Sequence, residues 1–262
     1  MPFPESTRVV YQHNPLAQVI TQLQFPPILT IGSGDPAEFQ ERIRHKFPLY
    51  RRETTVGIPP ELVNALKQMN VEPPNFPSGQ HTFTSADERA SIVLTRDFLA
   101  IEHRAYRNWE TFSDDVKLTR DALEAVYHPA FYSRVGLRYV NVIDRSVLGL
   151  AGEPWTALVN ERLVGILSDS RIEPDVSELT SAVVIGLSDP SGSSVTLRTG
   201  LRKTGDSPER HVYVVDADFS TTERTTPDAV TDRLTRFNRG NGNLFRWAIT
   251  SRLSNALGRD VG

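Results

Sequence analysis

The sequence predicts an α+β protein in which antiparallel sheets carry helices packed on one face. Two observations predict it. Short β-prone runs with alternating apolar and polar residues follow one another with turn residues between them, and amphipathic segments with helix-capping signals follow those runs. Such alternation is typical of strands with one buried face, as in antiparallel sheets. A chain of 262 residues can bury a substantial core without disulfides.

The first half opens with a predicted strand over residues 16–25, where Val19, Leu23 and Phe25 share a face. Asp35, Pro36 and Glu38 form a helix start signal, which predicts a helix over 36–47. A second, shorter helix is expected after Pro59 and Pro60, and the prolines at 73, 74 and 77 end it. This cluster predicts a surface loop.

Three β-prone runs, 81–86, 90–95 and 98–103, predict a β-meander because turn-like pairs separate them. Thr111 and Asp114 form a capping box for a helix that ends before Pro129. The alternating run 134–143 predicts another strand.

The second half begins with a connector. Trp155, Val159, Leu163 and Ile166 recur at helical spacing and predict a helix from Pro154. The runs 179–187 and 194–201 predict a hairpin around 189–192, and 211–219 adds a strand. Two further helices are expected: one from Thr226 that the stretch 239–243 breaks, and one with apolar residues at steps of four that ends at Gly258. Those apolar residues are Phe245, Ile249, Leu253 and Leu257.

The two halves share one order of elements. In each, a meander ends in a strand that carries an acid, Glu102 or Asp216, and a polar linker leads to a helix that starts near Thr111 or Thr225. This order suggests an internal duplication, although the sequence identity is too weak to establish one. We expect an N-terminal α+β half over 1–145, a helical connector over 146–176, and a meander with two helices over 177–262.

No catalytic constellation is recognisable, so the sequence predicts a protein that is not an enzyme and has no cofactor or metal. The absence of cysteine excludes thiol catalysis, disulfides and cysteine-ligated metals. The six histidines are scattered; a metal site would have to join His103 and Glu102 to His211, and surface-facing strand residues explain them more simply. Asp216 and Asp218 share a strand face, as an acid–base pair would, but salt bridges to arginines are the preferred interpretation.

The net charge of −3 does not favour a general nucleic-acid binder. Neither an export signal nor a membrane-spanning run is found, so a cytoplasmic protein without membrane contact is expected. Arg233, Arg236 and Arg239 recur every third residue and form a candidate binding stripe for nucleic acid; nearby acids favour weak binding and a salt-bridged face. The stretch Arg239–Asn243 is the closest match to a phosphate-holding loop, but a turn between helices explains its glycines fully and is the preferred interpretation.

Trp247 is a candidate binding residue. It lies two positions from Phe245 and therefore points away from the predicted apolar stripe of the last helix. Two interpretations stay open: the chain itself covers Trp247, or Trp247 anchors a protein partner or a second copy.

The stretch 14–25, which begins Asn14-Pro-Leu and ends in Gln-Phe25, and Arg134-Val-Gly-Leu-Arg-Tyr-Val-Asn at 134–141 resemble an uncharacterised prokaryotic family with a sporadic distribution. The resemblance covers essentially the whole chain. It implies a fold lineage and no reaction, cofactor or substrate, while the patchy distribution suggests an accessory system such as defence or a toxin–antitoxin module.

The leading hypothesis from the sequence is a non-enzymatic protein-interaction or regulatory component of such a system. One alternative is a nucleic-acid-binding protein that uses the arginine stripe. The other is a small-ligand-binding protein or enzyme with a pocket assembled by the fold between the helices and a curved sheet.

Overall fold

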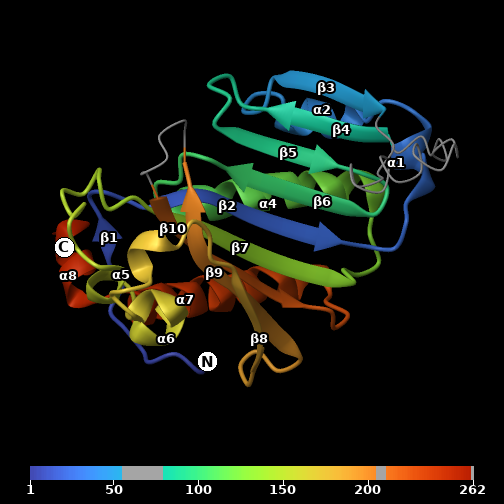
Figure 1. Ribbon diagram of the computed structural model, residues 1–262. Coiled ribbons are helices and arrows are strands. Elements are labelled where there is room, and N and C mark those ends of the chain that lie inside the picture. The colour runs from blue at the N-terminus through green and yellow to red at the C-terminus, as the bar shows by residue number, and fades with distance from the viewer. Residues whose placement is uncertain (55–78, 205–210, 261–262) are drawn as a thin grey trace, which may run out of the picture.

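The computed structural model describes residues 1–54, 79–204 and 211–260 and confirms the α+β class (Figure 1). The helix and loop expected over 59–77 lie outside these residues. One nine-stranded sheet, antiparallel throughout, has the order β3-β4-β5-β6-β2-β7-β10-β9-β8. In that order the strands are Leu49–Thr54, Gly79–Thr84, Ala90–Leu94, Phe98–His103, Leu16–Gln24, Arg134–Ile143, His211–Thr221, Ser193–Lys203 and Ser181–Leu187.

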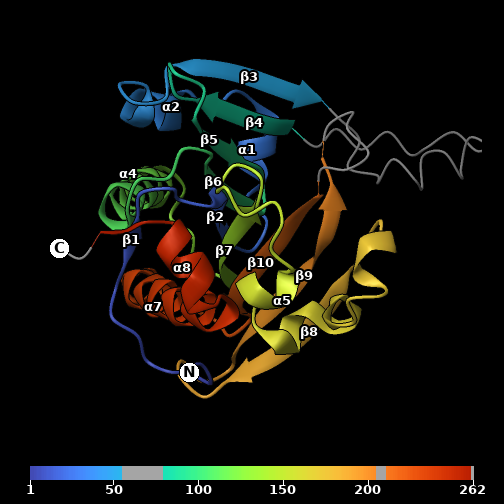
Figure 2. The same ribbon diagram turned by 60° about the vertical axis from the view of Figure 1, so that its left-hand side comes forward.

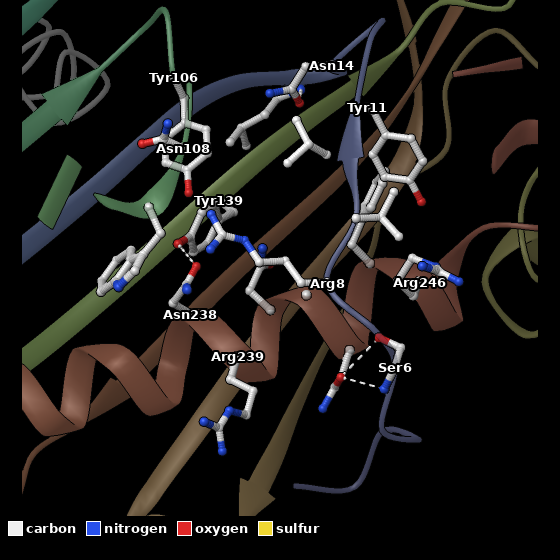
Figure 3. A pocket seen from close by; sticks show the side chains of 18 of the residues that line it. Ser6, Arg8, Tyr11, Asn14, Tyr106, Asn108, Tyr139, Asn238, Arg239 and Arg246 are labelled. Atoms are coloured by element: carbon white, nitrogen blue, oxygen red, sulfur yellow. Dashed lines mark hydrogen bonds between the residues drawn. The ribbon is translucent and has the colours of Figure 1, made fainter. Parts of the chain in front are cut away.

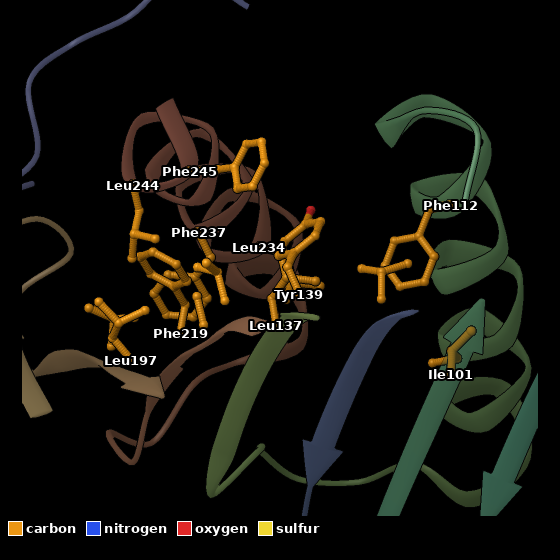
Figure 4. Close-up of a cluster of buried hydrophobic side chains, with 14 of the residues drawn as sticks. Ile101, Phe112, Leu137, Tyr139, Leu197, Phe219, Leu234, Phe237, Leu244 and Phe245 are labelled. Atoms are coloured by element: carbon orange, nitrogen blue, oxygen red, sulfur yellow. The ribbon is translucent and has the colours of Figure 1, made fainter. Parts of the chain in front are cut away.

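Two long helices, α4 (Trp109–Tyr127) and α7 (Val230–Ala248), cover the same face of the sheet (Figures 1 and 2). The core lies between them and the strands. Phe112 of α4 and Phe237 of α7 are fully buried, as are Ile101 and Phe219 on the strands beneath (Figure 4). The predicted alternation is confirmed in β2, where Val19 and Leu23 are buried while Gln18, Gln22 and Gln24 on the other face are partly exposed.

The strands of both halves join in the middle of the sheet. β2 pairs with β7, with Leu23 opposite Val135 and Ile20 opposite Arg138. On one side the meander β4-β5-β6 precedes α4, and on the other β8-β9-β10 precedes α7. The predicted order of elements is therefore found in both halves, while a common ancestry of the halves and the three proposed segment boundaries stay predictions.

The prediction that residues 239–243 break a helix is wrong, since α7 continues through both glycines of that stretch. A Cβ at Gly240 would lie 2.5 Å from the Met1 side chain and 3.0 Å from the Phe219 ring, so glycine lets the helix approach the sheet closely. The residues around it, Phe237 and Leu244, are fully buried. This burial outweighs the low helix propensity of glycine.

The predicted start of the last helix is also wrong. Ile249 has extended backbone angles and forms a bridge with Val159, so Phe245 belongs to α7 and a separate helix, α8 (Ser251–Ala256), follows. The Thr250 side chain caps α8 by accepting from the Leu253 amide. Gly258, with a φ of 70°, ends this region as predicted.

The connector is not one helix. It consists of α5 (Trp155–Leu158), α6 (Glu161–Val164) and the short 3-10 helix Gly165–Ser168. Val159 is extended and Gly165 has a φ of 53°, so both interrupt the helical path. Trp155 is buried as expected, whereas Ile166 is 51% exposed.

Shorter elements complete the fold. Before β3 lie α1 (Leu29–Ser33) and α2 (Ala37–Ile43), the latter within the predicted 36–47 segment. The remaining 3-10 helices are Glu173–Asp175 and Pro227–Ala229. Asn108, rather than Thr111, caps α4, because its side chain accepts from the Thr111 amide. Near the two ends of the chain, β1 (Val10–Tyr11) pairs with β11 (Arg259–Asp260).

None of the helices in the described part of the chain has the length and apolar character needed to cross a membrane.

Candidate ligand-binding pocket between α4 and α7

A pocket of about 520 Å³ lies between the start of α4 and the C-terminal half of α7, on the helix-covered face of the sheet (Figure 3). The two helices contact each other elsewhere, where Arg120 Nη1 of α4 donates to Thr231 Oγ1 of α7 at 2.7 Å. β7 contributes Tyr139 and Asn141 to the lining. The pocket therefore lies where the two helices are no longer joined to each other directly.

Residues 5–11 form another wall of the pocket and link the two helices. The Ser6 amide and Oγ both donate to Asn243 Oδ1 at 3.1 Å, and Arg246 Nη1 donates to the Thr7 carbonyl at 3.4 Å. On the other side, Arg8 donates to both carboxylate oxygens of Glu110 at 2.6 and 2.7 Å. The N-terminal segment thus runs from α7 to the first turn of α4.

Two buried phenols form part of the lining. Tyr139 donates to Asn238 Oδ1 at 2.8 Å, and its ring packs edge-on against the Tyr106 ring at a centroid distance of 6.1 Å. Burial raises the pKa of Tyr106 to about 12 and that of Tyr139 well above its ordinary value. Both phenols are therefore neutral at physiological pH and supply hydrogen bonds without charge.

The charged residues of the lining are mostly positive. Four arginines, Arg8, Arg107, Arg239 and Arg246, face a single acid, Glu5. Arg107 and Arg239 are exposed and form no ion pair with any described residue. An excess of guanidinium groups in a concave site favours an anionic ligand, because carboxylates and phosphates match their donor geometry.

Amide side chains make up much of the rest. Six asparagines line the pocket: Asn14, Asn108, Asn141, Asn238, Asn241 and Asn243. Asn241 is only 9% exposed, and its Oδ1 has no hydrogen-bond partner among the described residues. A buried acceptor without a donor costs free energy unless something satisfies it. The Oδ1 atom has almost no solvent-accessible surface, so this cost falls on the folded protein and a ligand in the pocket does not relieve it.

The predicted arginine stripe does not act as one surface. Arg233 lies 3.8 Å from Glu223, while Arg236 forms ion pairs with Asp189 at 2.7 Å and with Asp232 at 2.8 Å. Arg239 alone of the three faces the pocket. Arg233 and Arg236 therefore belong to a salt-bridged face, as the preferred interpretation had it. Arg239 instead forms part of the pocket lining.

The chain itself covers part of Trp247. Its ring lies 5.4 Å from that of Phe3, and its backbone carbonyl accepts from Asn160 Nδ2 at 3.0 Å. The side chain is partly buried against the core. Of the two interpretations of Trp247, the geometry favours intramolecular packing by the N-terminal segment.

Within the described residues, no group of three His, Asp or Glu side chains could hold a metal ion. His103 instead contacts the buried Asp115 of α4 at 3.0 Å, and Lys46 contacts the same carboxylate. Burial alone would raise the pKa of Asp115, but the hydrogen bonds from His103 and Lys46 outweigh it and lower the pKa.

The two acids of β10 form the salt bridges that were preferred from the sequence. Arg138 holds Asp216 with two hydrogen bonds of 2.7 Å, and Arg134 holds Asp218 at 3.0 and 3.1 Å. All four side chains lie on the sheet face opposite α4 and α7 and are remote from the pocket. Asp216 and Asp218 are therefore structural ion-pair partners.

The sequence does not predict most of the pocket. Residues 5–11 carry no recognisable motif, and the stretch 239–243 favours a turn over a phosphate-binding loop. A usable signal was present in α7: Asn238, Asn241 and Asn243 interrupt a run whose apolar spacing continues to Phe245. Residues with low helix propensity inside a helix indicate that packing or function, and not local propensity, determines the residue types there.

The fold and the pocket together define a class: an α+β protein with one open antiparallel sheet and a polar, arginine-lined pocket between its two main helices. No family model matches the chain, and a search among curated proteins returns no match. A solved structure described as "KH domains" aligns over 97% of this chain and 90% of its own, at 10% identity and a TM-score of 0.25. This likeness is too weak to support an inference about fold or function.

Proposed function

We propose that the protein binds a small anionic ligand in the pocket between α4 and α7 and acts as a non-enzymatic regulatory component. The observation that carries the proposal is the convergence of unpaired groups on one concave site. Arg107 and Arg239 both line the pocket and have no ion-pair partner among the described residues. A volume of about 520 Å³ lies in the range of small-ligand sites.

Binding, rather than catalysis, is proposed because the lining lacks an activated nucleophile. The Ser6 hydroxyl donates to an amide oxygen of Asn243, which is no general base. The buried phenols Tyr106 and Tyr139 have raised pKa values and hold their protons. The titratable groups of the lining therefore favour electrostatic recognition.

Isothermal titration calorimetry with a panel of small carboxylates and phosphates tests the proposal. We expect at least one anion to bind with a Kd below 1 mM, and Arg239→Gln to weaken that binding about tenfold or more. Arg162→Gln is the matched control, because Arg162 is an exposed arginine of α6 outside the pocket. Equal losses in both variants, or no binding by any anion, would contradict the proposal.

A second candidate function, protein interaction, is favoured by the edge strand β8. β8 ends the sheet, and Val183 and Val184 are 45% and 68% exposed. Its sequence, Ser-Ala-Val-Val-Ile-Gly-Leu, has no charge, whereas the other edge, β3, carries Arg51 and Arg52. An uncharged apolar edge can accept another strand.

Light scattering on Val184→Lys tests this second candidate. We expect a wild-type dimer or partner complex that the lysine on β8 dissociates. Leu49→Lys is the control, since Leu49 is 46% exposed on the opposite edge. A monomeric wild type without a partner, or equal effects of the two lysines, would remove this candidate.

A further inference from the structure

We infer that β8 pairs with β8 of a second copy of this chain, in an antiparallel register centred on Val184. This inference rests on the second candidate function, strand addition at the β8 edge, and names both the partner and the register. β8 lies at the end of the sheet, and β9 is its only neighbour among the described strands (Figure 1). The backbone direction, the side-chain sizes, one glycine and the charges all point to a second copy.

The backbone groups of β8 alternate between β9 and the open edge. The Leu179 amide donates to the Leu201 carbonyl, in register with the strand pairs that follow, so the odd-numbered residues of β8 bond to β9. The amides and carbonyls of Ala182, Val184 and Gly186 therefore point outward. In an antiparallel pair centred on Val184, this residue lies opposite its own copy and Ala182 lies opposite Gly186. One twofold contact thus satisfies all of these outward groups.

The side chains of β8 match in size in the same register. Val183, which lies beside the buried Leu197 on the helix-covered face, comes opposite Ile185 of the second copy. Val184 meets its own copy on the other face of the sheet. Both valines are exposed in the single chain. The contact would therefore remove apolar surface from water on both faces, with β-branched side chains as cross-strand neighbours.

Gly186 has no role in the packing of a single chain. A Cβ at this position would meet no atom within 4 Å, and its backbone is not in the left-handed region. Glycine inside a strand lowers stability, and it often marks a place where another backbone approaches closely. In the proposed pair, Gly186 lies opposite the small Ala182 of the second copy. The close approach of a second backbone therefore explains this glycine.

The charges favour β8 over the other edge of the sheet. β8 has no charged residue, whereas three of the six residues of β3 are charged. Two acids flank β8, Glu178 before it and Asp189 after it, and antiparallel pairing brings the end of one copy to the start of the other. Each acid already has a partner in its own chain, Glu178 with Arg202 at 3.5 Å and Asp189 with Arg236 at 2.7 Å. These acids therefore enter the contact with their charges compensated.

Single cysteines test the register, because the chain has no cysteine of its own. Residues of a hydrogen-bonded antiparallel pair have Cα atoms about 5.5 Å apart, a separation that a disulfide can span. Val184→Cys should therefore form a disulfide-linked dimer under mild oxidation. Ala182→Cys and Gly186→Cys should cross-link only when the two variants are mixed. Leu49→Cys, exposed on the opposite edge, is the control that should not cross-link.

Analytical ultracentrifugation measures the association without a cross-link. We expect the wild type to sediment as a dimer, and Val184→Lys to weaken the dimer about tenfold or more. Leu49→Lys should sediment as the wild type does. Val184→Lys should keep the circular dichroism spectrum of the wild type, because the side chain it replaces is exposed. Neither test depends on the anion site, since no residue of β8 lines the pocket.

The outcomes separate this inference from the candidate function on which it rests. A monomeric wild type overturns self-pairing, and strand addition then stands only if another protein forms a complex that Val184→Lys dissociates. A dimer that Val184→Lys leaves intact overturns both. A dimer that Val184→Lys dissociates, but in which Val184→Cys does not cross-link, overturns the proposed register while β8 remains an interface.

Discussion

Arg8 and Glu110 form a bidentate ion pair, with N–O distances of 2.6 and 2.7 Å, that connects the N-terminal segment to the first turn of α4. The Arg8 hydrogen bond lowers the pKa of Glu110 to about 2, so the pair is charged at neutral pH. Both side chains are more than half exposed. The pair therefore contributes little stability and mainly neutralises one arginine of the pocket.

Glu110→Gln should accordingly strengthen the binding of an anionic ligand, by about two- to fivefold, because Arg8 is then free to face the pocket. The free energy of unfolding should change by less than about 1 kcal/mol. Calorimetry and urea unfolding measure the two quantities. Asp169→Asn, which removes the exposed pair with Arg171 far from the pocket, should leave binding unchanged. A weaker affinity in Glu110→Gln would show that the ion pair, and not the freed arginine, serves the ligand.

The two glycines of α7 should respond in opposite ways to alanine. Gly242→Ala should stabilise the protein by about 0.5–1 kcal/mol, because alanine favours a helix and its Cβ meets no atom within 4 Å. Gly240→Ala should destabilise it, since the Cβ meets Met1 and Phe219. Thermal unfolding of the two variants provides the comparison, and a gain in both would contradict the close packing of α7 on the sheet.

Asn241→Leu should raise the stability of the protein. Replacing a buried amide that has an unsatisfied oxygen removes a desolvation cost of about 1–3 kcal/mol and adds apolar contact. Urea unfolding of the variant and the wild type measures the difference. A large loss of stability in the variant would mean that the Asn241 oxygen is satisfied within the protein.

The folded protein should lose stability in mild acid because of His81. It is fully buried, with Nδ1 3.0 Å from the Tyr50 hydroxyl and Nε2 3.0 Å from the Ile31 carbonyl. Burial lowers its pKa, so the folded protein keeps His81 neutral while the unfolded chain binds the proton. The contribution of His81 is therefore complete above about pH 6.5 and declines as the pH falls below it, with a slope of at most about 1.4 kcal/mol per pH unit.

Urea unfolding of the wild type and of His81→Gln at pH 7.0, 6.0 and 5.0 tests this prediction. Glutamine retains hydrogen-bonding groups but does not titrate, so its stability should depend less on pH over this range. Parallel pH dependences of the two proteins would assign the acid sensitivity to other groups, Asp115 being expected to act only at lower pH because its pKa is lowered.

The strands could be predicted because their pattern is local. The alternation of Val19, Leu23 and Phe25 with glutamines is sufficient to identify β2 and its buried face. The continuity of α7 could not be predicted, because it depends on Phe219 and Met1 packing against Gly240 from distant parts of the chain. Glycine and asparagine have low helix propensity, and only tertiary contacts override it.

The pocket also could not be predicted, because residues far apart in the sequence form it. Ser6 and Asn243, which form one of its corners, are 237 positions apart in the chain. Neither residue type indicates a site by itself, and no spacing rule links them. The sequence predicts Arg239 as a binding residue, but as part of a stripe whose other members pair with acids. Arg239 does line the pocket, and its role in binding stays a prediction.

The central position of β2 has a consequence for the order in which the protein can assemble. Gln24 pairs with Phe98 on one side and with Arg134 on the other, so both neighbours of β2 are translated long after it. Until then its edges remain open on the nascent chain, where they can pair wrongly or recruit a chaperone. The N-terminal segment waits longer still, since Asn243, which accepts from Ser6, follows it by 237 positions. The pocket therefore forms only after α7 has been translated, and a product that stops before α7 would lack it.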